Sequence, residues 1–277
     1  MCDYRARLSK DGHFAMKRTL IAATVAAIVG PVLCAGQTPE EKGLAIVREA
    51  DRRFKGYGDA ISRLRMILRN KQGQVSEREL RIRVLETPDD GDRSLSIFDS
   101  PADVKGTVLL THAHRSEPDD QWLYLPALER VKRIAAQNKS GSFMGSEFSY
   151  EDIATQAIEK YSYQWLRDET CQGQDCHVIE RRPLDKQNSG YTRQIIWIDK
   201  EHLRTLQIEY YDRKDSLLKT LTFQDYRLYL DRFWRPHDMN MVNHQTGKSS
   251  QLVWFDYAFR TGLTENDFNQ HNLTRIR

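Results

Sequence analysis

Side chains that could do chemistry are scattered along this chain, and few are spaced as a catalytic or metal site requires. His112 and His114 place two imidazoles on one face of a possible strand, a spacing that can bind metal. Asp119 and Asp120 follow closely, but no third ligand is evident. We interpret the two histidines as part of a polar outer face, with a metal site as the alternative, and we expect no metal and no cofactor.

The other reactive residue types give no stronger signal for an enzyme. A serine nucleophile of the G-x-S-x-G type is missing from the glycine- and serine-rich stretch GSFMGSEF, residues 141–148. The adjacent acids Glu151 and Asp152, like Asp119 and Asp120, fall at expected helix starts or turns, where capping and solvation are their ordinary roles. We therefore predict that the protein is not an enzyme and assign no catalytic residue.

The beginning of the chain resembles an export signal. Met16-Lys17-Arg18 precede the apolar run TLIAATVAAIVGPVL, residues 19–33, and a polar stretch starts at Gln37. The run is shorter than the roughly 20 residues of a membrane-spanning helix. We predict an over-extended start over 1–15, a cleaved signal peptide over 16–36, and a periplasmic mature protein over 37–277.

Four cysteines are compatible with export. Cys2 and Cys34 leave with the presequence, and lipidation of Cys34 is an alternative that the large preceding residue Leu33 disfavours. Cys171 and Cys176, in ETCQGQDCHVIE, flank a four-residue turn that contains Gly173. In an oxidising compartment this spacing predicts a disulfide at a hairpin tip, with a zinc site as the alternative.

The composition limits the partners of the protein. The chain has 277 residues and a formal net charge of +3, which is small against 42 Lys and Arg and 39 Asp and Glu. A nucleic-acid-binding protein concentrates basic residues on one face, so we expect no nucleic-acid partner. No linker rich in Pro, Gly or Ser divides residues 37–277, and we predict one domain and a monomer.

The mature chain begins with a helix and continues as strands. Thr38-Pro39-Glu40-Glu41 is a helix start, and apolar residues recur at helical spacing up to Gly56. The apolar period then becomes two, as in antiparallel strands with one buried face. We expect roughly ten strands in a meander, too many for a flat sheet; the strand candidates that the pattern delimits are residues 61–69, 79–84, 203–210, 217–229, 239–243 and 252–259.

The centre of the chain carries more apolar surface than a simple strand needs. Trp122 and Tyr124 point one way and Leu123 and Leu125 the other, so this strand is covered on both faces, either by solid packing or by a ligand. The cations that follow, Arg130, Lys132 and Arg133, form a solvated face or attract an anionic partner. The loop 138–148 then leads into a short helix that a Ser149–Asp152 capping box starts.

These segments resemble a known family. WLYLPALERVKRI followed by NKSGSFMGSEFSYEDI, and later GYTRQIIWIDKEHLRTLQIEYYDRKDSLLKTL and MNMVNHQTGKSSQL, are similar to the outer-membrane lipoprotein-sorting family related to the LolA and LolB carriers. The resemblance covers most of the mature chain. It implies a mainly β fold, a curved and unclosed antiparallel barrel covered by short helices, that binds acyl chains in the periplasm and has no catalytic residue.

The resemblance and the periodicity together give a site hypothesis. The partners would be lipoprotein acyl chains or other lipids, with an outer-membrane acceptor or a permease of the resistance–nodulation–division (RND) type; the alternative is a non-carrying interaction subunit of such a permease. The loop residues Phe143, Met144 and Phe148 form a lid or a plug. The predicted cavity lining, which periodicity alone does not distinguish from solid core, is Leu64, Met66, Leu68, Leu80, Ile82, Val84, Leu95, Ile97, Trp122 and Tyr124.

Overall fold

The computed structural model describes residues 36–276. The start and the signal peptide predicted from the sequence lie outside the described residues, except for Gly36. Two α-helices, thirteen strands and five short 3-10 helices follow one another along the described chain. They are α1 (Pro39–Phe54), β1 (Asp59–Arg69), β2 (Val75–Leu85), β3 (Arg93–Ser100), β4 (Val108–His112), β5 (Asp120–Leu125), η1 (Pro126–Leu128), β6 (Arg130–Ile134), η2 (Ala136–Asn138), α2 (Tyr150–Ile153), η3 (Ile158–Lys160), β7 (Tyr161–Cys171), β8 (Gln174–Pro183), β9 (Arg193–Asp199), β10 (Thr205–Tyr211), β11 (Leu217–Tyr229), β12 (Phe233–Asn243), β13 (Ser249–Phe259), η4 (Glu265–Phe268) and η5 (Gln270–Arg275).

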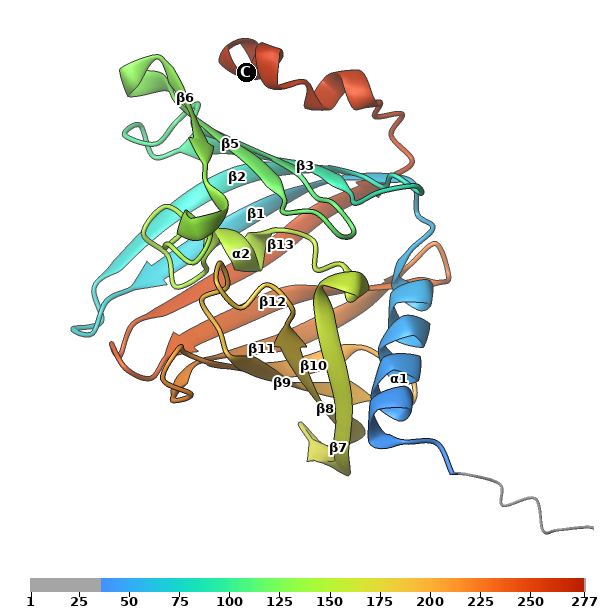
Figure 1. The fold of residues 1–277 in the computed structure, drawn as a ribbon. Helices are drawn as coiled ribbons and strands as arrows, with labels where there is room; N and C mark the ends of the chain where they lie inside the picture. Colours follow the sequence, from blue (N-terminus) through green and yellow to red (C-terminus); the bar gives the residue numbers. More distant parts are fainter. Residues whose placement is uncertain (1–35, 277) are drawn as a thin grey trace, which may run out of the picture. The chain divides into compact units, whose positions relative to one another are not determined.

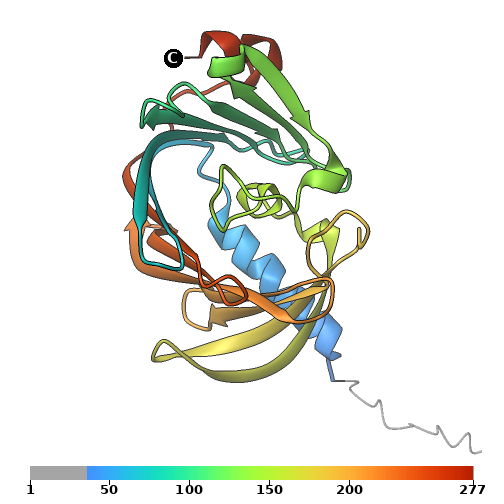
Figure 2. The same cartoon turned by 90° about the vertical axis from the view of Figure 1, so that its left-hand side faces the viewer.

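All thirteen strands belong to one antiparallel sheet. Its spatial order is β6-β5-β4-β3-β2-β1-β13-β12-β11-β10-β9-β8-β7, so adjacent strands in the sheet are consecutive in sequence except for β1 and β13. The sheet curves strongly, and its two edge strands, β6 and β7, do not pair with each other (Figures 1 and 2). The predicted unclosed, curved antiparallel barrel is therefore confirmed, with thirteen strands where the periodicity suggested about ten.

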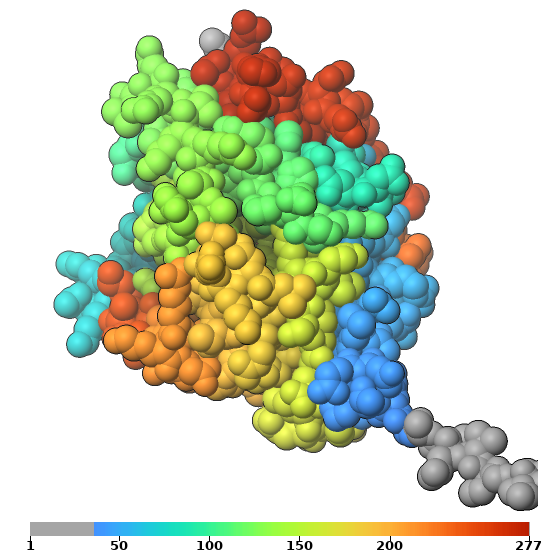
Figure 3. Space-filling model, in the orientation of Figure 1, coloured from blue at the N-terminus to red at the C-terminus, as the bar shows by residue number. Residues whose placement is uncertain are grey.

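Helix α1 lies inside the curve of the sheet (Figure 2). Its start is fixed by a complete capping box, in which the Thr38 hydroxyl accepts from the Glu41 N–H and the Glu41 carboxylate accepts from the Thr38 N–H. Gly43 lets the helix approach β7 closely, since a Cβ there would lie 2.7 Å from the backbone nitrogen of Trp165. Figure 3 shows the blue helix against the yellow-green strand that it covers.

Two hydrophobic clusters lie on opposite faces of the sheet. The larger one fills part of the concave side and includes Met66, Leu80, Leu123 and Met241, with Leu44 and Val47 of α1 packed against it. The second lies on the outer face of β3, β4 and β5, where Phe268 and Leu273 of the C-terminal short helices η4 and η5 cover it. Strand β5 is therefore covered on both faces, which explains why the apolar run at 122–125 has no wet side.

The predicted disulfide is not confirmed, since Cys171 and Cys176 are both free thiols in this structure. The register places Cys171 opposite Gln174 and Cys176 opposite Glu169, so the two cysteines are diagonal neighbours at the hairpin tip. Diagonal positions in an antiparallel pair lie about 7–8 Å apart, beyond the usual Cα separation of a disulfide. Burial raises the pKa of both thiols, that of Cys176 to about 11.

Among residues 36–276, none of the helices combines the length and the apolar character that crossing a bilayer takes.

Candidate functional site

A cavity of about 880 Å³ lies between α1 and the concave face of the sheet. This volume is within the range of roughly 300–1,000 Å³ that small-molecule sites occupy. Apolar side chains from the helix and from both halves of the sheet form much of its wall. They include Val47, Ile82, Val84, Ile196, Phe223 and Met239.

Arginines from β12 and the preceding turn fix the C-terminal end of α1 at the rim of this cavity. Arg235 donates to the carbonyl of Phe54 at 3.2 Å, and Arg232 donates to the carbonyl of Lys55 at 3.3 Å. Both bonds satisfy carbonyls that the end of a helix leaves without partners. The Arg235 side chain is buried among aromatic rings, 3.9 Å from the Phe54 centroid, and burial lowers its pKa.

The central segment 138–153, which we call the plug, closes part of the concave side. Phe143 and Phe148 are buried in the main hydrophobic cluster, and Met144 packs against them. Whether these three residues act as a lid or as a plug stays a prediction; in this structure they pack in or against the main cluster. The short helix α2 at its end has the predicted capping box between Ser149 and Asp152.

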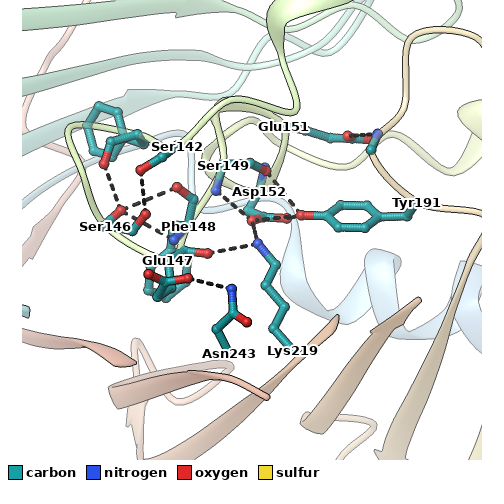
Figure 4. A network of polar contacts seen from close by, with 12 residues as sticks. Ser142, Ser146, Glu147, Phe148, Ser149, Glu151, Asp152, Tyr191, Lys219 and Asn243 are labelled. Carbon is teal, nitrogen blue, oxygen red and sulfur yellow. Dashed lines mark hydrogen bonds and ion pairs between the residues drawn. The ribbon is translucent and has the colours of Figure 1, made fainter. Parts of the chain in front are cut away.

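A buried ion pair holds the plug to the sheet. The Lys219 ammonium on β11 donates to the Asp152 carboxylate at 2.6 Å and to the Glu147 carbonyl at 2.8 Å. The side chains of Lys219 and Asp152 are only 4% and 3% exposed. Tyr191 donates to the same carboxylate at 2.9 Å, and burial raises its pKa well above the ordinary value. Figure 4 shows the three groups converging beneath the plug.

Further polar contacts connect the plug with loops far away in sequence. Glu151 accepts from the Ser189 hydroxyl at 2.6 Å and from the Gly190 N–H at 3.0 Å, and burial raises its pKa. Glu147 accepts from the Asn243 amide at 2.7 Å (Figure 4). The adjacent acids Glu151 and Asp152 thus act as structural acceptors, in line with the roles expected for such acids at a helix start.

The structure places six of the predicted lining residues on the concave face. Ile82 and Val84 line the cavity. Leu64, Met66 and Leu80 belong to the main cluster as nearly inaccessible core residues, and Leu68 packs at its margin. These six residues share one face of the sheet, as the alternation of apolar and polar residues predicts. Only part of that face borders the cavity.

The other four predicted lining residues face the opposite way. Leu95, Ile97, Trp122 and Tyr124 belong to the outer cluster beneath η4 and η5, and none is among the residues that line the cavity. The register explains the correction. Leu80 is opposite Phe98 and Val84 is opposite Ser94, so the even-numbered residues of β3 share the inner face and its odd-numbered apolar residues point outward.

The histidines and the cationic segment do not contribute to the cavity. His112 bonds the Phe268 carbonyl at 2.7 Å, and His114 bonds the Asp90 carboxylate at 2.6 Å. Within residues 36–276, no group of three His, Cys, Asp or Glu is placed to hold a metal ion. Arg130, Lys132 and Arg133 are exposed on the edge strand β6.

Most residues in the second half of the cavity wall could not be predicted from the sequence. Ile196 and Ile198 on β9 line the cavity, but the run QIIWI, residues 194–198, is apolar at successive positions and does not reveal its inner face. Arg181 on β8 and the arginines at the C-terminal end of α1 were also missed. A single arginine next to apolar residues has no signal that separates a cavity wall from a solvated face.

Comparison with known proteins identifies relatives of this fold. A family model described as "-like: Uncharacterized protein" matches residues 90–275. No curated protein matches the chain. A solved domain from Vibrio parahaemolyticus, described as an outer membrane lipoprotein-sorting protein, has 56% identity and a TM-score of 0.83, and the match covers 85% of this chain and 100% of that one.

Two further solved structures support this grouping. A DUF1329 family protein from Desulfovibrio piger has 31% identity and a TM-score of 0.80 over 85% of this chain and 99% of that one. A LolA superfamily protein from Nitrosomonas europaea, at 20% identity and a TM-score of 0.67, covers 83% of this chain and 98% of its own and shares the fold. The chain therefore belongs to the family of outer membrane lipoprotein-sorting proteins with a LolA-like fold.

Proposed function

We propose that this protein is a periplasmic carrier that binds acyl chains of lipoproteins or lipids between α1 and the curved sheet and moves them toward the outer membrane. The observation that supports the proposal most is the cavity of about 880 Å³ with apolar side chains in its wall. The relative described as an outer membrane lipoprotein-sorting domain supports the cargo class and the compartment. The export signal expected at residues 16–36 fits the same compartment.

The energetics of lipid transfer agree with a cavity of this kind. Moving a 16-carbon acyl chain into water costs on the order of 10 kcal/mol, at about 0.8 kcal/mol per CH₂. A dry cavity of this size would cost about 20 kcal/mol at roughly 24 cal/mol per Å³, more than the stability of a typical domain. The ligand-free protein must therefore contract, admit water or hold a lipid, and a bound acyl chain removes the penalty.

A carrier of this kind also needs a movable segment over its cavity, so that cargo can enter and leave. The plug, residues 138–153, and α1 are the two covers of the concave side. The Lys219–Asp152 pair holds the plug, and arginine bonds to the Phe54 and Lys55 carbonyls hold the C-terminal end of α1. We propose that Phe143, Met144 and Phe148 leave the core when cargo enters, which would give the plug the function of a lid.

A filled cavity should bind no cargo, and Ala50 offers a test because it lines the cavity from α1. Replacing Ala50 with phenylalanine is expected to lower the affinity for a fluorescent fatty acid at least tenfold, since the ring occupies the space of the chain. The matched control is Ala45→Phe, on the exposed side of the same helix, which should leave the affinity unchanged. Equal affinities for the wild type and both variants would place the ligand elsewhere.

The edge strand β6 keeps one alternative open. Its exposed cations Arg130, Lys132 and Arg133 suit a subunit that docks onto a membrane permease of the RND type without carrying lipid. Native mass spectrometry with lipid extraction separates the two functions. The carrier should release a co-purified lipid or bind a fatty acid saturably, whereas a non-carrying subunit should do neither.

A further inference from the structure

Arg181 is an unneutralised cation in the wall of the cavity. On β8 the odd-numbered Ile179 belongs to the main cluster of the concave face, whereas the even-numbered Val178 belongs to a cluster on the other face. Arg181 shares the inward parity of Ile179 and is one of the residues that line the cavity. A guanidinium therefore faces the space that we assign to a lipid.

The bonds of Arg181 leave most of its donors free. Its Nε donates to the Gln194 side-chain oxygen at 2.6 Å, and its guanidinium carbon lies 4.7 Å from the Tyr161 ring centroid. Within residues 36–276, Nη1 and Nη2 have no hydrogen-bond acceptor, and no carboxylate lies within ion-pair distance of the side chain. These two nitrogens are the ones that bind a carboxylate or phosphate in a bidentate manner.

Neighbouring arginines do have carboxylate partners, so the lack of one is particular to the position of Arg181. Arg182, next in sequence on the outer face, pairs with Glu180 at 2.6 Å. Arg204, which also lines the cavity, pairs with Asp199 at 2.9 Å. The arginines without a carboxylate partner in the described cavity wall are Arg181 and the two that bind the end of α1, Arg232 and Arg235.

The acids of the wall do not neutralise this charge. Six arginines line the cavity, against two carboxylates, Asp51 and Asp231. Asp51 is engaged by Lys55 at 3.1 Å, and Asp231 is exposed. An arginine stays charged at any physiological pH, and a partly buried charge without a counter-ion is unfavourable. The cavity wall thus carries positive charge that a neutral lipid would leave without a counter-ion.

We infer that the cargo is an amphiphile with an anionic group, a carboxylate or a phosphate ester, and that this group binds the free edge of Arg181 while the acyl chain follows the apolar wall. The inference rests on the proposed function and specifies its ligand class. Lysine in place of Arg181 would keep the positive charge but lose the planar pair of donor nitrogens. It should therefore bind the anionic group more weakly than arginine does.

Three probes with one chain length test the head group: dodecanoate, dodecyl phosphate and dodecanol, each competing at pH 8 with a fluorescent fatty acid. The wild type is expected to bind the two anions at least tenfold more tightly than the alcohol. Arg181→Gln should lose this preference while its affinity for dodecanol stays within about twofold. A preference for only one of the anions identifies the head-group chemistry.

The controls separate binding from folding. Arg181→Lys should retain part of the preference, and Arg182→Gln on the outer face should retain all of it; thermal melts check that each variant is folded. An unchanged anion preference in Arg181→Gln, or no preference in the wild type, overturns the inference and leaves the carrier function standing. If none of the three probes binds, the carrier function fails and the inference fails with it.

Discussion

Replacing Lys219 with methionine is expected to lower the free energy of unfolding by about 3–5 kcal/mol, because it leaves the Asp152 carboxylate charged and buried without its cation. The same change removes the bond to the Glu147 carbonyl and so loosens the plug. Chemical denaturation measures the loss. Proteolysis within residues 138–153 should become faster, because this segment loses its strongest attachment to the sheet.

Two further variants make this result specific. Arg227→Met removes an exposed ion pair with Asp225 on the same strand, β11, and should cost about 1 kcal/mol or less. In the double variant Lys219→Met/Asp152→Asn, the amide keeps the capping contact with Ser149 without a buried charge and should recover much of the lost stability. Equal losses for Lys219→Met and Arg227→Met would show that the buried pair does not hold the plug.

Replacing Asp92 with asparagine is expected to stabilise the protein at pH 8 by about 2–3 kcal/mol. Burial raises the pKa of this carboxyl from 3.8 to about 6, an effect that Glu86 and Asp51 increase and Lys55 reduces. Between these two pKa values the folded protein keeps a proton that the unfolded chain has lost, so stability falls as the pH rises from about 4 to about 6. Above pH 6 the penalty is constant, at about 1.4 kcal/mol per pKa unit.

Comparing the wild type with Asp92→Asn isolates the contribution of the Asp92 carboxyl to the pH dependence of stability. Wild-type stability, measured by denaturation at several pH values, should contain a decrease between pH 4 and 6 that Asp92→Asn lacks. At pH 4 the two proteins should differ little, since the wild-type carboxyl is then neutral. Asp89→Asn, at an exposed position of the same turn, serves as the control and should keep the wild-type profile. An equal difference in stability between the wild type and Asp92→Asn at pH 4 and at pH 8 would contradict the assignment.

Local signals in the sequence predicted the local structure well. The capping residues Thr38 and Ser149 predict where α1 and α2 begin, because a hydroxyl three residues before a carboxylate satisfies the free N–H groups of a helix start wherever it occurs. The period-two pattern predicts β1 and β2 in the same way. Both kinds of signal depend on neighbours within a few residues.

The orientation of each strand toward the cavity depends on register, which no local pattern contains. The turn between Leu85 and Arg93 determines that Leu80 meets Phe98; one residue more or less would bring Leu95 and Ile97 to the inner face. Cys171 and Cys176 are not directly opposite each other for the same reason, because the turn offsets their pairing. Arg181 could not be predicted as a cavity residue, since it becomes one only when α1 and eight other strands surround the same space.

The central claim is that removable space, rather than permanent packing, separates α1 from the concave face, and two tryptophans allow a direct test. Trp254 lines the cavity, whereas Trp122 lies in the outer cluster beneath the C-terminal helices. Two variants, each keeping one of these tryptophans with the other four replaced by phenylalanine, are titrated with a brominated fatty acid, which quenches indole fluorescence on contact. We predict saturable quenching of Trp254 and none of Trp122; equal quenching of both, or quenching of neither, would contradict the account.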